Sequence, residues 1–386
     1  MTAVDRNLLE NELLQTETRN LVGRNLMSEL QQQKVVENLK VPQINRNYWL
    51  RILFFGLGLF AYGSSSGLLT TLTLEVFPGN YEIVLLIGGL IGVVCTELLC
   101  RSGYYRQGLD DAFLLSAQCQ LIFGFGIITE NVLLTSIAAF FIGLIFFFRY
   151  VNSLSGLIAI VGFTAIFVAL IMEYKILPVA TLPFVMFLVS MMIYAVYSSF
   201  YLSDQSLIYR NRMYLIKIFS LLLFYFSVNY LVVRELSESL LNVVLKPGED
   251  ISFSWVFYIL TFLIPIAFVI VGVKMRDRMM LYAGMLTFAF SVFTIRFYYE
   301  FMPVETLVLI CGLMLLGAAY FSIMKIRHRV SGLSFLPDNS DDNESLMVAQ
   351  AIIANSVTSQ EQPATADSPI KFGGGGFSGG GAGESF

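Results

Sequence analysis

The sequence predicts an all-α, polytopic transmembrane helical bundle of about ten spans with both termini cytosolic. Three observations predict this class. Hydrophobic residues make up 56% of the 386 residues and charged residues only 13%, whereas soluble domains carry roughly 25% charged residues. A water-soluble fold of this length cannot cover so much apolar side chain with polar surface. The apolar residues also form continuous runs, whereas the strands of membrane barrels alternate over about ten residues.

Ten apolar runs lie within a predicted membrane domain of residues 48–326. The hydrocarbon core of a bilayer is about 30 Å thick and needs about 20 apolar residues per helix. The runs that satisfy this requirement are 50–72, 82–99, 110–129, 132–148, 153–173, 179–202, 213–233, 253–273, 279–296 and 305–325.

Basic residues test this division, because cytosolic loops of membrane proteins are enriched in Lys and Arg. With the N-terminus in the cytosol, fifteen basic residues flank the spans on the cytosolic side: Lys40, Arg46, Arg51, Arg101, Arg106, Arg149, Arg210, Arg212, Lys217, Lys274, Arg276, Arg278, Lys325, Arg327 and Arg329. Four lie on the opposite side: Lys175, Arg234, Lys246 and Arg296. Basic loops and loops with few basic residues alternate along the whole predicted membrane domain, which supports ten spans with both ends of the chain in the cytosol.

The N-terminal region, residues 1–47, is expected to form a cytosolic amphipathic helical arm. Its apolar residues recur at or near helical spacing, with Gln and Glu between them. Gly23 is expected to interrupt the arm, and the Lys40-Val41-Pro42 segment to end it. We expect the arm to lie on the membrane, to pack on the bundle or to pair with another copy. The alternative is a loosely ordered arm.

The C-terminal region, residues 327–386, is expected to be a cytosolic disordered tail that ends in FGGGGFSGGGAGESF. Glycine-rich sequence buries too little surface to offset the entropy lost on ordering. Three aromatic residues in this tail, Phe372, Phe377 and Phe386, do not suit a plain spacer. They are the candidate recognition residues for a protein partner.

This glycine-rich terminus resembles the C-termini of bacterial proteins with a TPM domain, where a Phe-Gly-rich run ends in small residues and an aromatic. The resemblance covers about fifteen residues and departs from the pattern by ending on Phe386 rather than Trp, and the TPM domain is absent. The membrane domain is similar to uncharacterised polytopic proteins of Bacteroidetes in the stretches YYRQGLDDAF and RFYYEFMPVETLVL. These resemblances imply a bacterial inner-membrane protein with its tail in the cytosol.

Ionisable residues inside spans are costly in lipid and therefore mark candidate functional positions. Glu97 precedes Arg101 by four residues on one helix face, which predicts an ion pair, with a proton or ion site as the alternative. Asp110 and Asp111 open the third span, where carboxylates complement the helix dipole and cap free N–H groups.

Uncharged polar residues mark the middle of two spans. Gln118 and Gln120 point to different faces of the third span and are expected to bond to neighbouring helices or to line a polar cavity. The Gly63–Gly67 run, which contains Ser64 and Ser65, is expected to bend or break the first span. Pro183 marks the sixth span, and paired breaks in two inverted halves are typical of transporter sites.

Two function classes follow from these features. The first is a structural or interaction protein of the bacterial inner membrane, with a protein partner for the arm or tail. The alternative is a secondary carrier or lipid-handling protein with a polar cavity between spans one, three and six. The candidate contacts of that cavity are Ser64, Ser65, Gln118, Gln120 and Glu97.

An enzyme is not expected, because the chain has a single histidine, His328, and none of its four cysteines forms a CxxC pair. Sequence motifs for nucleotide binding and zinc-dependent hydrolysis are also missing. No cofactor or metal is predicted. The net charge of -4 does not favour nucleic acid as a partner.

Overall fold

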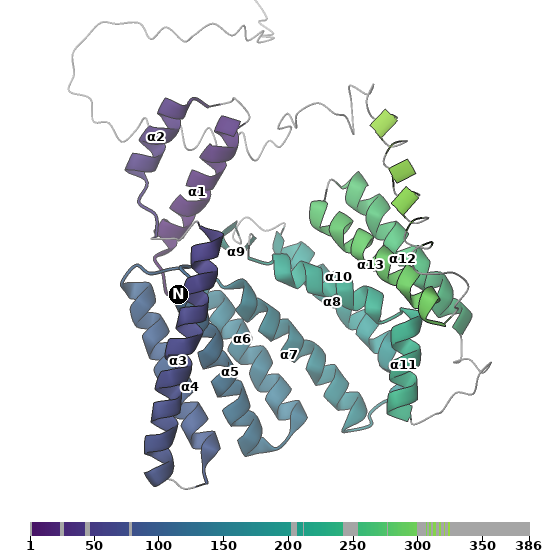
Figure 1. The fold of residues 1–386 in the computed structure, drawn as a ribbon, viewed down its shortest axis with the longest axis horizontal. Coiled ribbons are helices and arrows are strands. Elements are labelled where there is room, and N and C mark those ends of the chain that lie inside the picture. The colour runs from purple at the N-terminus through teal and green to yellow at the C-terminus, as the bar shows by residue number, and fades with distance from the viewer. Residues whose placement is uncertain are drawn as a thin grey trace, which may run out of the picture. The chain divides into compact units, whose positions relative to one another are not determined.

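The computed structural model describes residues 2–23, 27–42, 47–76, 79–201, 207–210, 212–241, 254–275 and 277–298, with scattered positions between 306 and 324. All regular elements in this part of the chain are helices (Figure 1). The chain divides into two units, Met1–Asn339 and Ser340–Phe386. The second unit lies outside the described residues, and with it the predictions for Phe372, Phe377 and Phe386.

Eight of the described helices are long and apolar enough to cross a membrane, which confirms an all-α bundle of membrane-spanning helices. They are α3 (Tyr48–Val76), α4 (Tyr81–Arg101), α5 (Leu109–Thr129), α6 (Val132–Tyr150), α7 (Ser153–Met172), α8 (Leu182–Tyr201, after the short 3-10 helix η1, Val179–Thr181), α12 (Ser254–Lys274) and α13 (Arg278–Tyr298). The chain is a multi-pass membrane protein. The predicted tenth span, 305–325, falls mainly outside the described residues.

The predicted seventh span, 213–233, is not one straight helix in the structure, although its two parts together are long and apolar enough to cross a membrane. Its residues form α10 (Tyr214–Phe226) and α11 (Tyr230–Leu241), which meet at 73°. Asn229 at the bend is fully buried, and its side-chain oxygen accepts a hydrogen bond from the N–H of Val232 at 3.3 Å. The N–H of Tyr230 donates to the hydroxyl of Thr261 at 3.0 Å. Polar side chains therefore bond the backbone groups that the helix leaves free.

The first span does not contain the predicted bend or break. α3 is continuous through the Gly63–Gly67 run. The hydroxyl of Ser65 donates to the carbonyl of Ala61 on the preceding turn, which satisfies this polar group without opening the helix. Pro183 lies in the first turn of α8. Backbone N–H groups of the first turn have no partner within the helix, so the N–H that proline lacks costs no helix hydrogen bond. The first and sixth spans are thus both regular helices in the described residues.

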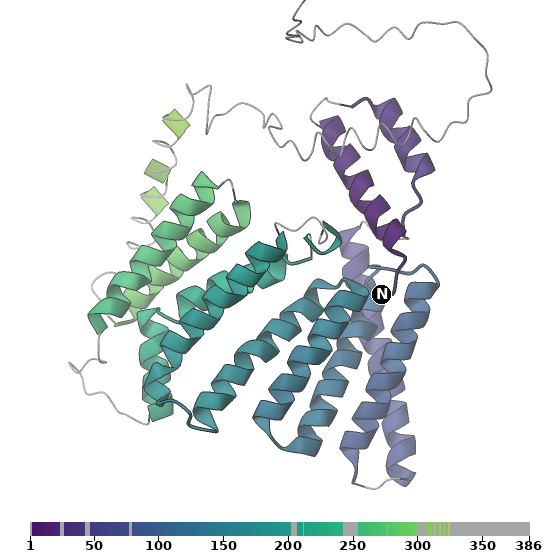
Figure 2. The same ribbon diagram turned by 180° about the vertical axis from the view of Figure 1, so that it is seen from behind.

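Helices α3 to α7 lie beside one another (Figure 2), and glycines in them allow a close approach. The most extensive packing joins α6 and α7. A Cβ placed on Gly162 of α7 would lie 2.6 Å from the backbone nitrogen of Phe140 on α6. This position therefore excludes any side chain, as expected where membrane helices associate by backbone contact rather than by a hydrophobic driving force.

The arm forms two helices, α1 (Arg6–Gly23) and α2 (Glu29–Asn38). Ser28 caps α2 in a reciprocal capping box with Gln31. The side chain of Gln15 on α1 donates to the carbonyl of Leu39 after α2 at 3.0 Å. Leu9 of α1 is buried against Tyr105 and Tyr150, so the start of the arm packs on one end of the bundle.

Candidate functional site

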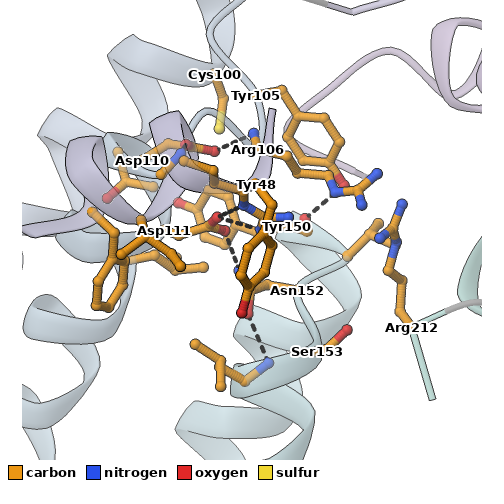
Figure 3. Close-up of a pocket in the computed structure, with 18 of the residues that line it drawn as sticks. Tyr48, Cys100, Tyr105, Arg106, Asp110, Asp111, Tyr150, Asn152, Ser153 and Arg212 are labelled. Atoms are coloured by element: carbon orange, nitrogen blue, oxygen red, sulfur yellow. Dashed lines mark hydrogen bonds and ion pairs between the residues drawn. The ribbon is translucent and has the colours of Figure 1, made fainter. Parts of the chain in front are cut away.

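Several helix ends surround a pocket of about 390 Å³ that is lined by charged, aromatic and apolar side chains (Figure 3). Its walls come from the start of α3, the end of α4, the loop 102–108, the start of α5, the junction of α6 and α7, and the start of α10. Because consecutive helices run in opposite directions, Arg51, Arg101 and Arg149 lie at this same end. We call it the basic end of the bundle.

Asp111 joins three helices at the wall of this pocket. Its Oδ2 accepts hydrogen bonds from Nε of Arg51 on α3 at 3.1 Å and from Nη2 of the same side chain at 2.5 Å. Its Oδ1 accepts from Nδ2 of Asn152 at 2.7 Å. Asn152 also caps α7, because its side-chain oxygen accepts from the N–H of Leu154 at 2.8 Å. Both oxygens of Asp111 are therefore used within the protein.

Asp110 organises the loop in front of α5. Its carboxylate accepts from the backbone N–H groups of Arg106, Gln107 and Gly108 at 2.5, 2.9 and 3.1 Å. Gly108 has φ +105, a conformation that favours glycine. These two aspartates were expected to cap free N–H groups at the start of the third span, but the N–H groups that Asp110 bonds belong to the loop before α5.

Two arginines of the pocket share one carboxylate. Nη1 of Arg106 lies 2.5 Å from Oε1 of Glu12 on α1, and Nη2 of Arg212 lies 3.4 Å from the same oxygen. The exposed fractions of the two arginine side chains are 17% and 16%. Burial, and after it the neighbouring Arg106 guanidinium, lowers the pKa of Arg212. Two partly desolvated positive charges thus face a single negative charge.

Tyrosines line the pocket beside these charges. Tyr105 is buried, and its hydroxyl donates to the carbonyl of Tyr150 at 3.3 Å. Burial raises the pKa of the Tyr105 phenol, so it remains a neutral donor. Tyr48, Ile52 and Tyr214 also line the pocket and are exposed, Tyr48 by 71%. The pocket therefore has a charged interior and an aromatic and apolar edge.

Glu97 lies beside this pocket and has more partners than the sequence predicted. The predicted pair with Arg101 is present at 3.4 Å. A shorter pair joins Oε1 of Glu97 to Nη2 of Arg149 on α6 at 2.7 Å, and the hydroxyl of Tyr150 donates to Oε2 at 3.3 Å. Glu97 is thus held in an ion-pair network that links α4 to α6.

The two glutamines of α5 do point to different faces, as predicted. Gln120 donates to the hydroxyl of Ser66 on α3 at 2.6 Å and accepts from the hydroxyl of Tyr62 at 2.9 Å. Gln118 is buried and donates to the hydroxyl of Ser155 on α7 at 2.6 Å. Its own oxygen is a buried polar atom with no partner among the described residues.

The predicted cavity contacts are not brought together in the structure. Ser64 and Ser65 are exposed on the outer face of α3, away from the buried Gln118. Gln120 contacts the first span through Ser66, which was not among the candidates. A second, apolar pocket of about 610 Å³ lies between α5, α6 and α7 and includes Cys119 but neither glutamine.

No family model, curated protein or solved structure matches this chain. The described residues hold no group of three or more His, Cys, Asp and Glu side chains arranged to bind a metal ion. The candidate site therefore consists of its charged, amide and tyrosine side chains.

Sequence reasoning missed the most informative members of this site, Glu12, Arg106 and Arg212. Arg106 and Arg212 were counted only as basic flanks of spans, and Glu12 as a polar residue of the arm. Glu12 lies 94 residues before Arg106 and 200 residues before Arg212 in the sequence, so no local spacing predicts the contact. The one available signal was the pair of aspartates that follows Arg106.

Proposed function

We propose that this multi-pass membrane protein is a lipid-handling protein that binds the anionic headgroup of a membrane amphiphile in the pocket at its basic end. The observation that supports this most is the Arg106 and Arg212 pair, which has one shared carboxylate from another part of the chain. Guanidinium groups are suited to bidentate binding of carboxylate and phosphate oxygens.

The other charged groups of the pocket have hydrogen-bond partners within the bundle. Asp111 is paired with Arg51, and Asp110 accepts three backbone N–H groups. Both carboxylates also lie at the N-terminus of α5, where the helix dipole stabilises negative charge. This leaves Arg106 and Arg212 as the cations of the pocket whose partner is exchangeable.

The edge of the pocket favours an amphiphile over a water-soluble anion. Tyr48, Ile52 and Tyr214 line the pocket and are exposed. Aromatic residues at the ends of membrane helices sit at the level of lipid headgroups. An anionic headgroup in the pocket would leave its acyl chains beside these apolar side chains.

The basic end faces the cytosol in this proposal, because basic residues are retained on the cytosolic side of membranes. Lys217 of α10 pairs with Asp277 before α13. This pair supports placing the basic residues before α10 and those between α12 and α13 at the same end of the bundle. The tail resemblance favours the inner membrane of a bacterium, with both termini in the cytosol.

Lipid retention by the purified protein tests the proposal. Protein in nanodiscs with equal phosphatidic acid and phosphatidylcholine is expected to retain phosphatidic acid selectively in native mass spectrometry. Changing both Arg106→Gln and Arg212→Gln should reduce this retention about tenfold or more, since charged hydrogen bonds contribute about 1.5–3 kcal/mol each. Arg101→Gln, which removes an exposed charge from the same end, is the control. Equal retention by all variants would contradict the proposal.

A second candidate function is an interaction protein, which the exposed face of α2 favours. Leu30 is 72% exposed and Val36 is also exposed on this short helix. Phe372, Phe377 and Phe386 of the tail are the further candidate contacts. Deleting residues 368–386 is expected to abolish co-purification of a partner, and an unchanged set of partners would refute the role of the tail.

A further inference from the structure

The carboxylate of Glu12 occupies the position between Arg106 and Arg212 that an anionic ligand would need. One oxygen, Oε1, contacts both guanidinium groups. Glu12 belongs to α1, which precedes the membrane domain, whereas the arginines belong to the loop before α5 and the segment before α10. The contact therefore joins the arm to two separate parts of the pocket wall.

We propose that the space held by the Glu12 carboxylate is a phosphate subsite and that Glu12 is a tethered competitor for it. This inference rests on the proposed function, because it assigns the chemical class of the headgroup and the group that the headgroup displaces. A ligand phosphate takes the place of Oε1 and bonds both guanidinium groups.

Phosphate fits this position better than a second carboxylate does. Glu12 offers one negative charge to two guanidinium groups, whereas a phosphate monoester carries about -1.5 to -2 charges at neutral pH and three acceptor oxygens. Arginine forks bond such oxygens in pairs. The bound headgroup would thus balance the charge of Arg106 and Arg212 more completely than Glu12 does.

Glu12 can leave this position while α1 stays docked. The N–H of Ala3 donates to the carbonyl of Arg149 at 2.7 Å, and Val4 and Leu9 are buried against the bundle. These contacts hold the start of the arm independently of Glu12. The Glu12 side chain is 21% exposed, so a change of rotamer gives it access to water. Displacement therefore needs a side-chain movement only.

Affinity for a phosphate lipid tests this competition directly. Titration of phosphatidic acid into phosphatidylcholine nanodiscs should give about tenfold tighter binding for Glu12→Gln than for the unchanged protein, because the competing charge is removed. Glu10→Gln, an equal charge change on the exposed face of α1, should leave affinity unchanged. Equal or weaker binding by Glu12→Gln would overturn the inference.

A shorter acid distinguishes displacement from a general effect of charge. Glu12→Asp keeps the charge on α1 but withdraws it by one methylene, so competition at the subsite predicts affinity between those of the unchanged protein and Glu12→Gln. Affinity equal to that of the unchanged protein would show that only the net charge of the arm matters. Melting temperatures of the three variants establish that each one is folded.

Inorganic phosphate identifies the group that is recognised. In Glu12→Gln, inorganic phosphate should displace bound phosphatidic acid at concentrations where chloride of equal ionic strength does not. Equal displacement by both salts would contradict a phosphate subsite. If binding depends on Arg106 and Arg212 but not on Glu12, the subsite inference fails and the proposed function stands. If binding is independent of both arginines, the proposed function fails as well.

Discussion

Arg51 and Asp111 hold α3 against α5 through two hydrogen bonds to a single carboxylate oxygen, at 3.1 and 2.5 Å. α3 is the most exposed of the eight candidate spans, since 11% of its most apolar window is buried. Tyr62 and Ser66 of α3 also bond Gln120 of α5, and the Arg51–Asp111 pair is the charged contact at the wall of the pocket.

Asp111→Asn is expected to destabilise the protein by about 1–3 kcal/mol. Removing one partner of a buried ion pair costs about 3–5 kcal/mol, and partial exposure of Arg51 reduces this value. The melting temperature in detergent measures the effect. Glu10→Gln, which breaks an exposed pair with Arg6, should change it little. Equal melting temperatures for both variants would show that the Asp111 contacts do not hold α3.

Gly162→Ala is expected to destabilise the packing of α6 on α7 by about 1–3 kcal/mol, the usual cost of overpacking. The added Cβ would lie 2.6 Å from the backbone nitrogen of Phe140. Gly63→Ala is the matched change, because nothing lies within 4 Å of a Cβ at that helical position. Thermal unfolding should separate the two variants, with Gly63→Ala equal to or above the unchanged protein. The reverse order would contradict the described packing.

Tyr225→Phe is expected to loosen the bend between α10 and α11. The Tyr225 hydroxyl shares a 2.8 Å hydrogen bond with that of Ser291 and accepts one from the Asn229 amide at 2.8 Å. All three side chains are buried, so removing the hydroxyl should cost about 1–3 kcal/mol through unsatisfied partners. Unfolding in detergent measures this cost, and Tyr282→Phe, a 63% exposed tyrosine, is the control. No difference between the two would argue against the buried network.

Cysteine labelling is expected to place the basic end of the bundle and its opposite end on different sides of the membrane. With the protein expressed in the inner membrane of a bacterial host and its native cysteines removed, Ile176→Cys should react with an impermeant maleimide added to cells whose outer membrane is permeabilised. Ser102→Cys, at the basic end, should react only after the inner membrane is opened. Both positions are exposed beside candidate spans. Labelling of Ser102→Cys in intact spheroplasts would reverse the proposed orientation.

Local patterns in the sequence predicted much of the helical framework. Apolar runs locate the eight described spans, and i,i+4 spacing predicted the Glu97–Arg101 pair. The bend at Asn229 was missed because Val228 and Tyr230 on either side are apolar or aromatic, and only the partners Tyr225 and Thr294 explain why the Asn229 amide is buried there. A polar residue inside an apolar run was the available signal.

Long-range contacts limited the prediction of the site. Glu97 was predicted to pair within its own helix, yet its shorter pair is with Arg149, 52 residues away. Ser64 and Ser65 were chosen for their position in the span, but the helix face that reaches α5 carries Ser66. Which of three adjacent serines faces a neighbour depends on the rotation of α3 against the bundle, and packing of the whole domain sets that rotation.

A density map of Glu12→Gln in nanodiscs containing phosphatidic acid tests the central claim most directly. The claim predicts density of phosphate size within hydrogen-bonding distance of the guanidinium groups of both Arg106 and Arg212, with acyl-chain density leaving the pocket past Tyr48 and Tyr214. An empty pocket, with lipid density only along the outer faces of the spans, would contradict it.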